Sequence, residues 1–217
     1  MLRLITLCAF FATAGVAGTE NFDAAQPGSL PAGWTTALTG EGGPPSWQVM
    51  ADSSAPSKPN VLAQTSNDKT SRRFPLAVYE KATIRDGEVS VRFKPVSGTV
   101  DQAAGIVWRF RDAGNYYIVR ANALENNVVL YKVENGKRVP LAPRGTPANT
   151  YGVKHTVPAQ TWSRLSVSFR GNLFTVSFNG EKLFEVEDNT FSDPGRIGLW
   201  TKADSITYFD DFEFSGR

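Results

Sequence analysis

Paired carboxylates are the first residues in this chain whose spacing could do chemistry. Cleavage of a glycosidic bond needs two carboxyl groups about 5–9.5 Å apart, one on each side of the bond. Glu185 and Glu187 have the i, i+2 spacing that places both side chains on one face of a strand. No third carboxylate accompanies them, and a solvated strand face is the simpler interpretation. Asp210 and Asp211 are adjacent, so they point to opposite faces, and we expect one of them to cap backbone groups or bind a structural ion.

A general base is the next chemistry to consider. His155 is the one histidine of the chain and lies in a loop, without a nucleophile motif beside it. Glu125 follows a predicted strand and is the second candidate for a base. The sequence therefore offers two weak catalytic candidates, Glu125 and His155, and no complete catalytic set.

The candidate metal ligands in this sequence are carboxylate and amide oxygen atoms of loop residues. One histidine and a single cysteine, Cys8 in the leader described below, make a zinc site improbable. Loop carboxylates and amides suffice for a structural calcium ion, although turn formation explains them too. The residues in question are Asp112, Asn115, Asp188, Asn189 and Asp193. No motif requires a cofactor.

A set of polar and aromatic residues shares one predicted sheet face. In the strands expected at 104–111, 116–122 and 197–202, apolar residues alternate with these side chains, so the second set faces away from the core. Aromatic rings with charged or amide groups are the chemistry that binds sugars. We therefore predict a saccharide site on a concave sheet, made by Arg109, Tyr116, Arg120, Asn122, Asn127, Trp200 and Lys202. In the alternative, the charged residues only solvate the sheet and Trp200 packs under a loop; a one-residue bulge would also exchange the two faces.

The elements that must position these residues are strands. Residues 87–96 and 162–169 alternate apolar and polar side chains, and Asn135-Gly136 and Asn179-Gly180 are strong hairpin signals. A sustained helical period is missing from the sequence. Many short strands with regular turns predict an all-β fold, a two-sheet antiparallel jelly-roll sandwich. Residues 19–58, rich in Gly, Pro and Ser, predict an N-terminal arm that Trp34 and Trp47 anchor to the core; Trp162 is expected to pack likewise.

Composition limits the compartment and the partners. Residues 1–18 resemble a cleavable signal peptide, with Arg3, an apolar stretch at 4–14 and small residues at 15–18. We therefore expect a secreted or periplasmic protein, a single domain over 19–217, without membrane insertion after cleavage. The net charge of +2, with no basic stripe, disfavours nucleic acid as a partner. The oligomeric state stays open.

Three segments carry a resemblance to a known family. They are Ala104–Arg120 (AGIVWRFRDAGNYYIVR), Trp162–Glu187 with its Phe178–Phe184 hairpin (FNGEKLF), and Gly195–Asp204 (GRIGLWTKAD) followed by Phe209-Asp-Asp-Phe212. Together they resemble secreted bacterial laminin G-like, concanavalin A-like sandwiches and the 3-keto-disaccharide hydrolase domain. The resemblance covers about residues 22–214 and implies a jelly roll; the function it implies is an expectation by analogy.

Three functions follow as hypotheses, in order of preference. The first is a non-catalytic saccharide-binding domain. The second is an enzyme of the 3-keto-glycoside hydrolase or lyase kind, with Glu125 or His155 as the base that removes a proton beside a carbonyl. The third is an extracellular structural or adhesive domain whose partner is a protein.

Overall fold

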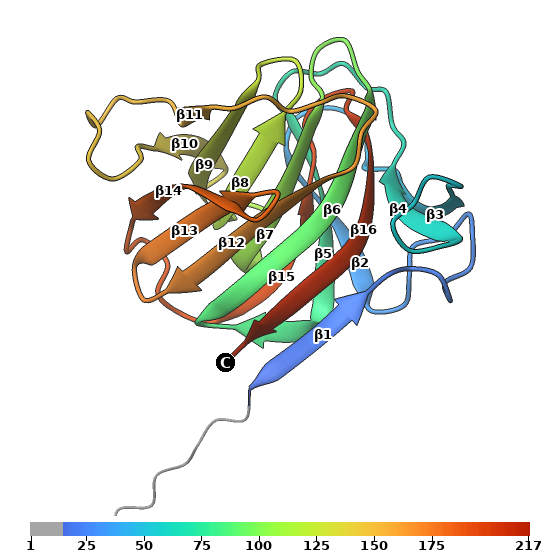
Figure 1. The fold of residues 1–217 in the computed structure, drawn as a ribbon, viewed down its shortest axis with the longest axis horizontal. Helices are drawn as coiled ribbons and strands as arrows, with labels where there is room; N and C mark the ends of the chain where they lie inside the picture. Colours follow the sequence, from blue (N-terminus) through green and yellow to red (C-terminus); the bar gives the residue numbers. More distant parts are fainter. Residues whose placement is uncertain (1–14) are drawn as a thin grey trace, which may run out of the picture.

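Two antiparallel sheets form the protein (Figure 1). The computed structural model describes residues 15–217, and no helix occurs in that range. Sheet A has the order β14 (Glu181–Glu187), β13 (Leu173–Phe178), β12 (Ser163–Arg170), β6 (Gly87–Ser97), β16 (Ile206–Gly216), β4 (Asn60–Gln64) and β3 (Trp47–Ala51), with β1 (Val16–Glu20) also on β16. Sheet B has the order β10 (Lys137–Leu141), β9 (Asn127–Glu134), β8 (Asn115–Asn122), β7 (Ala103–Asp112), β15 (Gly195–Trp200), β5 (Arg73–Ile84) and β2 (Trp34–Gly40), with β11 (Val153–Lys154) on β9. The predicted jelly-roll sandwich is confirmed.

The alternating segments form the centre of sheet A. Antiparallel pairing places Val89 opposite Val167 and Val91 opposite Leu165, all fully buried between the sheets. The polar residues between them point outward, as the period of two dictates. The hairpin turns behave as predicted too, because Asn179 and Gly180 both have positive φ, at 50° and 86°.

Aromatic side chains fill the space between the sheets. Trp108 of sheet B stacks on Tyr117 at 5.4 Å and on Phe169 of sheet A at 6.0 Å. Trp34 and Trp47 are 5 % and 6 % exposed within the same core, so their predicted burial is confirmed. Trp162 is only partly buried; its indole N–H donates to Ser54 Oγ at 3.2 Å.

The N-terminal segment contributes strands as well as an arm. β2 extends sheet B along β5, and β3 extends sheet A along β4. Residues 1–14 of the predicted signal peptide lie outside the described range. Residues 16–18 form more than half of β1, which pairs with β16 from Val16–Gly216 to Glu20–Phe212. Within residues 15–217, no helix is long and apolar enough to span a bilayer.

Sheet B curls strongly, and its outer face is filled by its own side chains. In a flat sheet, β10 and β5 would lie about 24 Å apart, five strand spacings of about 4.8 Å. Instead the Arg138 guanidinium of β10 lies 4.6 Å from the Phe74 ring of β5. Thr39 of β2 likewise reaches Tyr116 of β8, with 2.9 Å between the two hydroxyls. We call the buried apolar set on this face the second core; it comprises Phe74, Leu76, Val78, Ala103, Val107, Phe110, Tyr116, Ile118, Val129, Tyr131, Val133 and Trp200.

Candidate functional site

A cluster of polar side chains closes one end of the second core. It lies where β8 ends, β9 begins, and the loops before β7, after β15 and before β11 meet. We call it the polar cluster; it comprises Asp101, Arg120, Asn122, Glu125, Asn127, Tyr131, Tyr151 and Lys202. Strand pairing builds it, because Asn122 stands opposite Asn127, and Arg120 stands two residues further along the same face of β8.

Arg120 is the centre of the polar cluster and is fully buried. Its guanidinium donates to Asn127 Oδ1 at 2.7 Å, to Glu125 Oε2 at 2.7 Å and to Tyr151 Oη at 3.0 Å. Burial alone would lower its pKa, but Tyr131, Glu125 and Tyr151 together raise the pKa of Arg120 above its usual value. A planar guanidinium with several partners holds them in fixed directions. Arg120 therefore positions Glu125 and Tyr151 at the surface.

Glu125 carries the ionised carboxylate of the polar cluster. Its side chain is 37 % exposed, and its Oε2 also accepts from Asn127 Nδ2 at 3.1 Å. Burial raises its pKa, but the charge of Arg120 and the hydrogen bonds from Arg120 and Asn127 outweigh burial, so the pKa of Glu125 lies below its usual value. At neutral pH the group is a carboxylate that accepts hydrogen bonds and can accept a proton.

Asp101 and Lys202 form the other half of the polar cluster. Lys202 Nζ pairs with Asp101 Oδ2, and Asn122 Nδ2 donates to Asp101 Oδ1. Asn122 Oδ1 in turn accepts the backbone N–H groups of Leu124 and Glu125 at 2.9 and 3.1 Å. Asp101 is 1 % exposed, whereas the Lys202 side chain is 17 % exposed. The buried members therefore shape the β8–β9 turn, and Lys202 reaches the surface.

Apolar side chains accompany the cluster at the surface. Tyr151 is 46 % exposed, and its hydroxyl is shared with Tyr131 and Arg120. Leu124, in the loop that follows Asn122, is 49 % exposed, and Val100, in the loop beside Asp101, is 39 % exposed. An exposed ring beside a carboxylate and an ammonium group can contact both the C–H face and the hydroxyls of a polar ring.

The other predicted ligand contacts lie elsewhere. Trp200 and Tyr116 are on the predicted face but fully buried: Trp200 stacks on Phe74 at 5.5 Å and lies under Arg138 at 5.6 Å. The predicted exposure of Trp200 on an open concave sheet is therefore corrected, because the curl of sheet B closes the middle of that face. Arg120, Asn122 and Asn127 are buried as well, so among the predicted residues Lys202 alone reaches the surface, together with the catalytic candidate Glu125.

Arg109 belongs to a different part of the molecule. The register of β7 on β8 shifts after Trp108, and Arg109 has φ = 48°, so a bulge turns its side chain away from the second core. Its guanidinium donates to the carbonyls of Arg85, Phe191 and Gly171 at the opposite end of β7. The predicted placement of Arg109 beside Arg120 is wrong for this reason.

His155 and the predicted calcium ligands do not join the polar cluster. The His155 ring packs edge-on against Phe178, with 4.5 Å between ring centroids. Asp112 accepts from Gly114 N within its own turn, Asp193 pairs with Arg111 at 2.8 Å, and Asp188 accepts from the Tyr117 hydroxyl at 2.6 Å. Within the described part of the chain, no three His, Cys, Asp or Glu side chains are grouped to hold a metal ion. A bound calcium ion stays a prediction.

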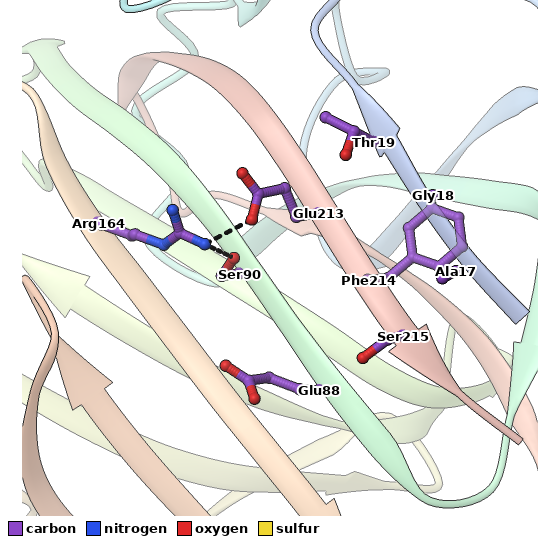
Figure 2. Close-up of a pocket in the computed structure, with 9 residues that line it drawn as sticks. All are labelled: Ala17, Gly18, Thr19, Glu88, Ser90, Arg164, Glu213, Phe214 and Ser215. Carbon is purple, nitrogen blue, oxygen red and sulfur yellow. Dashed lines mark hydrogen bonds and ion pairs between the residues drawn. The ribbon is translucent and has the colours of Figure 1, made fainter. Parts of the chain in front are cut away.

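A hollow lies on the outer face of sheet A (Figure 2). This groove of about 440 Å³ runs between β1 and β12 across β16 and β6. Arg164 donates to Ser90 Oγ at 2.7 Å and to Glu213 Oε2 at 2.6 Å across its floor, as Figure 2 shows. Phe214, the one aromatic residue among those lining it, is 7 % exposed. The groove therefore offers charges but no open ring face, and it suits a sugar less well than the polar cluster does.

Residues 20–215 match the sequence profile of the 3-keto-alpha-glucoside-1,2-lyase-like domain. The chain belongs to this family. No curated protein sequence matches it.

Solved structures with similar folds include sandwiches whose names concern carbohydrates. Carbohydrate binding module CBM66 from Bacillus subtilis aligns with a TM-score of 0.62 at 20 % identity, over 83 % of this chain and 93 % of that one. The cellulose induced protein Cip1 aligns at 0.60 and 13 %, over 90 % and 95 % of the two chains. Domain 4 of an extracellular arabinanase from Geobacillus stearothermophilus, solved with arabinotriose, aligns at 0.51 and 12 %, over 83 % and 82 %. At these identities the alignments show a shared fold.

Sequence reasoning missed three members of the polar cluster. Tyr151 and Asp101 lie in loops, and Tyr131 lies in β9 among apolar neighbours. The signal available in the sequence was Tyr151-Gly152, an aromatic residue followed by a glycine in a polar loop. In the structure this glycine has φ = 60°. A Cβ at Gly152 would collide with the Val128 carbonyl oxygen, so the glycine lets this loop lie close against β9.

Proposed function

We propose that this protein binds saccharides at the polar cluster, with Tyr151, Glu125 and Lys202 as the contacting side chains. The observation that carries the proposal is the Arg120 guanidinium, which is fully buried and holds both Glu125 and Tyr151 at the surface. A buried cation that fixes an exposed carboxylate and an exposed ring prepares a binding site before the ligand arrives.

Each contact has a distinct role in this proposal. The Tyr151 ring packs against the C–H face of a pyranose, since aromatic side chains combine apolar area with a polar tip. The Glu125 carboxylate accepts from sugar hydroxyls, and Lys202 donates to them; hydrogen bonds with one charged partner are about twice as strong as neutral ones. Leu124 and Val100 provide the apolar rim.

The family and the structural neighbours support this choice of ligand class. The family is named for a lyase that acts on 3-keto-alpha-glucosides. Two of the similar sandwiches are a carbohydrate binding module and an arabinanase domain solved with arabinotriose. A glucoside or its 3-keto form is accordingly the first ligand to try. The N-terminal sequence predicts a secreted or periplasmic protein, and this location agrees with a ligand that is an extracellular sugar.

Binding is tested by isothermal titration of a panel of gluco-disaccharides and their 3-keto forms. Tyr151→Ala should weaken binding about tenfold, equivalent to about 1.4 kcal/mol. Tyr151→Phe keeps the ring and loses the hydroxyl shared with Arg120, so it separates stacking from positioning. Tyr208→Ala, a partly buried tyrosine on the outer face of sheet A, is the matched control and should bind as the unaltered protein does. An unchanged affinity in Tyr151→Ala would exclude the polar cluster as the site.

A lyase is the second candidate function, and family membership favours it. In that reaction Glu125 removes the proton at C2 beside the C3 ketone. The electron pair forms the C1–C2 double bond, the C1–O bond breaks, and the departing oxygen takes up a proton. Glu125 is ionised at neutral pH, as a base must be, although its lowered pKa makes it a weak base.

Turnover distinguishes the two functions. A lyase converts a 3-keto-glucoside into a free alcohol and an enone that is followed by its ultraviolet absorbance. Glu125→Gln should abolish turnover and retain measurable binding, whereas His155→Gln should leave turnover unchanged because His155 packs on Phe178. Binding without turnover in the unaltered protein would identify a binding protein and exclude the lyase.

A further inference from the structure

The opposite end of the sandwich holds a pocket that the proposed function does not use. The β5–β6 turn, the β12–β13 turn and the loop from β14 to β15 enclose a cavity of about 340 Å³. In Figure 1 this is the end where the C-terminus lies, since Arg217 O accepts from Arg85 N at 2.7 Å. We call it the arginine pocket; its lining residues are Arg85, Asp86, Arg109, Gly171, Asn172, Asn189 and Ser192.

Arg109 forms the buried wall of this pocket, with 1 % of its surface exposed. It donates to Phe191 O at 2.6 Å, to Gly171 O at 2.7 Å and to Arg85 O at 3.0 Å, one carbonyl from each of the three enclosing segments. These contacts give the guanidinium N–H groups their hydrogen-bond acceptors, but carbonyl groups are neutral and do not balance the positive charge. The nearest carboxylate oxygen is Asp86 Oδ1 at 3.6 Å, and it also accepts from Gly171 N. The positive charge of Arg109 is therefore only partly compensated.

The local backbone is shaped around this arginine. The positive φ of Arg109 is uncommon for a residue with a Cβ, and such conformations persist where the surroundings impose them. Gly195 lies against the Arg109 backbone so closely that a Cβ there would approach it to 2.5 Å. Burial lowers the pKa of Arg109, which agrees with a cation that lacks full compensation.

A second cation lies at the mouth of the pocket. The Arg85 side chain is exposed and makes no ion pair or hydrogen bond within residues 15–217. Asn172, Asn189 and Ser192 are exposed beside it and provide amide and hydroxyl groups. Among the residues lining the pocket, two guanidinium groups thus face one carboxylate, with neutral donors and acceptors around them. The cavity is at the small end of the range for ligand pockets.

We propose that the arginine pocket binds a hydroxylated organic carboxylate, with a uronate residue of an acidic saccharide as its ligand. The carboxylate pairs with Arg85 and is drawn by the charge of Arg109, and guanidinium groups match carboxylates in shape. The sugar hydroxyls bond to the Asn172 and Asn189 amides and to Ser192. This site is independent of the polar cluster, since the two lie at opposite ends of β7.

The probes are glucuronate, glucose and inorganic sulfate, titrated into the whole protein by calorimetry and by amide chemical shifts. Glucuronate should bind at least tenfold more tightly than glucose and more weakly in 0.3 M salt. The shifts should appear at Gly171 and Ser192 rather than at Leu124 and Tyr151, so failure here is distinct from failure at the polar cluster.

Substitutions at exposed positions keep the test separate from folding. Arg85→Gln should weaken glucuronate binding at least tenfold, and Ser192→Ala should weaken it less. Arg72→Gln, which removes another exposed arginine, is the control and should stay within twofold. Equal affinity for glucose and glucuronate, an unchanged affinity in Arg85→Gln, or shifts confined to the polar cluster would each overturn the proposal. Sulfate binding as tightly as glucuronate would overturn the sugar acid as ligand and leave a site for simple anions.

Discussion

Replacing Trp200 by alanine tests the closure of sheet B. Trp200 is fully buried between Phe74 and Arg138, although its sequence position suggests an exposed ring on a ligand-binding face. Truncating a buried Phe or Trp to Ala costs about 3–5 kcal/mol. Domains of this kind have a total stability of about 5–15 kcal/mol, so the loss is a large fraction of it.

Trp200→Phe separates packing from the polar atom of the indole. The Nε1 of Trp200 is buried without a hydrogen-bond partner among the described residues, so removing it relieves an unsatisfied donor. Phenylalanine also keeps a ring stacked on Phe74. We expect this variant to lose about 1–2 kcal/mol, from the volume that the smaller ring leaves empty.

Urea denaturation followed by intrinsic fluorescence measures both variants, with the midpoint and slope read separately. Trp162→Ala is the matched control: its ring is partly exposed and packs against Lys94 at 5.2 Å. It should cost about 1 kcal/mol. If Trp200→Ala costs less than Trp162→Ala and instead removes saccharide binding, the outer face of sheet B is open and the placement of Trp200 in a second core is refuted.

Two further predictions concern acid and the chain terminus. Asp204 accepts the backbone N–H groups of Thr99, Val100 and Asp101 at 2.7–3.0 Å. Burial raises the pKa of Asp204, but these hydrogen bonds outweigh burial and hold the pKa below its usual value. A carboxyl group with a lowered pKa stabilises the fold at pH values above its pKa in the unfolded chain, and this stability is lost as the pH falls through its pKa in the folded protein. Asp204→Asn should therefore flatten the fall of the urea midpoint between about pH 5 and pH 2. An equally steep fall in this variant would contradict the prediction. Cleavage after residue 18 would remove Val16, Ala17 and Gly18 from β1 and leave Thr19 and Glu20 to pair with β16. A chain that begins at Thr19 should therefore have a lower urea midpoint than one that begins at Val16, and equal midpoints would mean that residues 16–18 add nothing to the stability of sheet A.

Local patterns predicted the strands that have one face in the core. Alternation in 87–96 and 162–169, and the Asn-Gly turns at 135–136 and 179–180, depend only on neighbouring residues, and the structure has them as predicted. The sequence did not predict β5 as a strand, because Arg73–Tyr79 is buried on both faces and shows no alternation of apolar and polar residues.

The candidate site was predictable only in part. Arg120, Asn122 and Asn127 lie together as predicted, since strand period and one hairpin fix their relation. Lys202 joins them through Asp101, which no sequence pattern singled out. The closure of the second core depends on how far sheet B curls, which no short segment of sequence specifies. The displacement of Arg109 depends on one bulge in β7. A bulge of one residue reverses the predicted facing of every side chain beyond it on the same strand.

β16, at the C-terminal end of the sequence, is an interior strand of sheet A. β16 pairs with β6 on one side and with β4 and β1 on the other, so it joins the strands from the beginning of the chain to those from its centre. Sheet A is therefore complete only when Ile206–Gly216 has joined its two parts. Pairings of such large sequence separation make folding slow, because the chain loses loop entropy before the contacts form. Truncation within β16 therefore exposes two strand edges inside the sheet, those of β6 and of β4 with β1, instead of shortening its border.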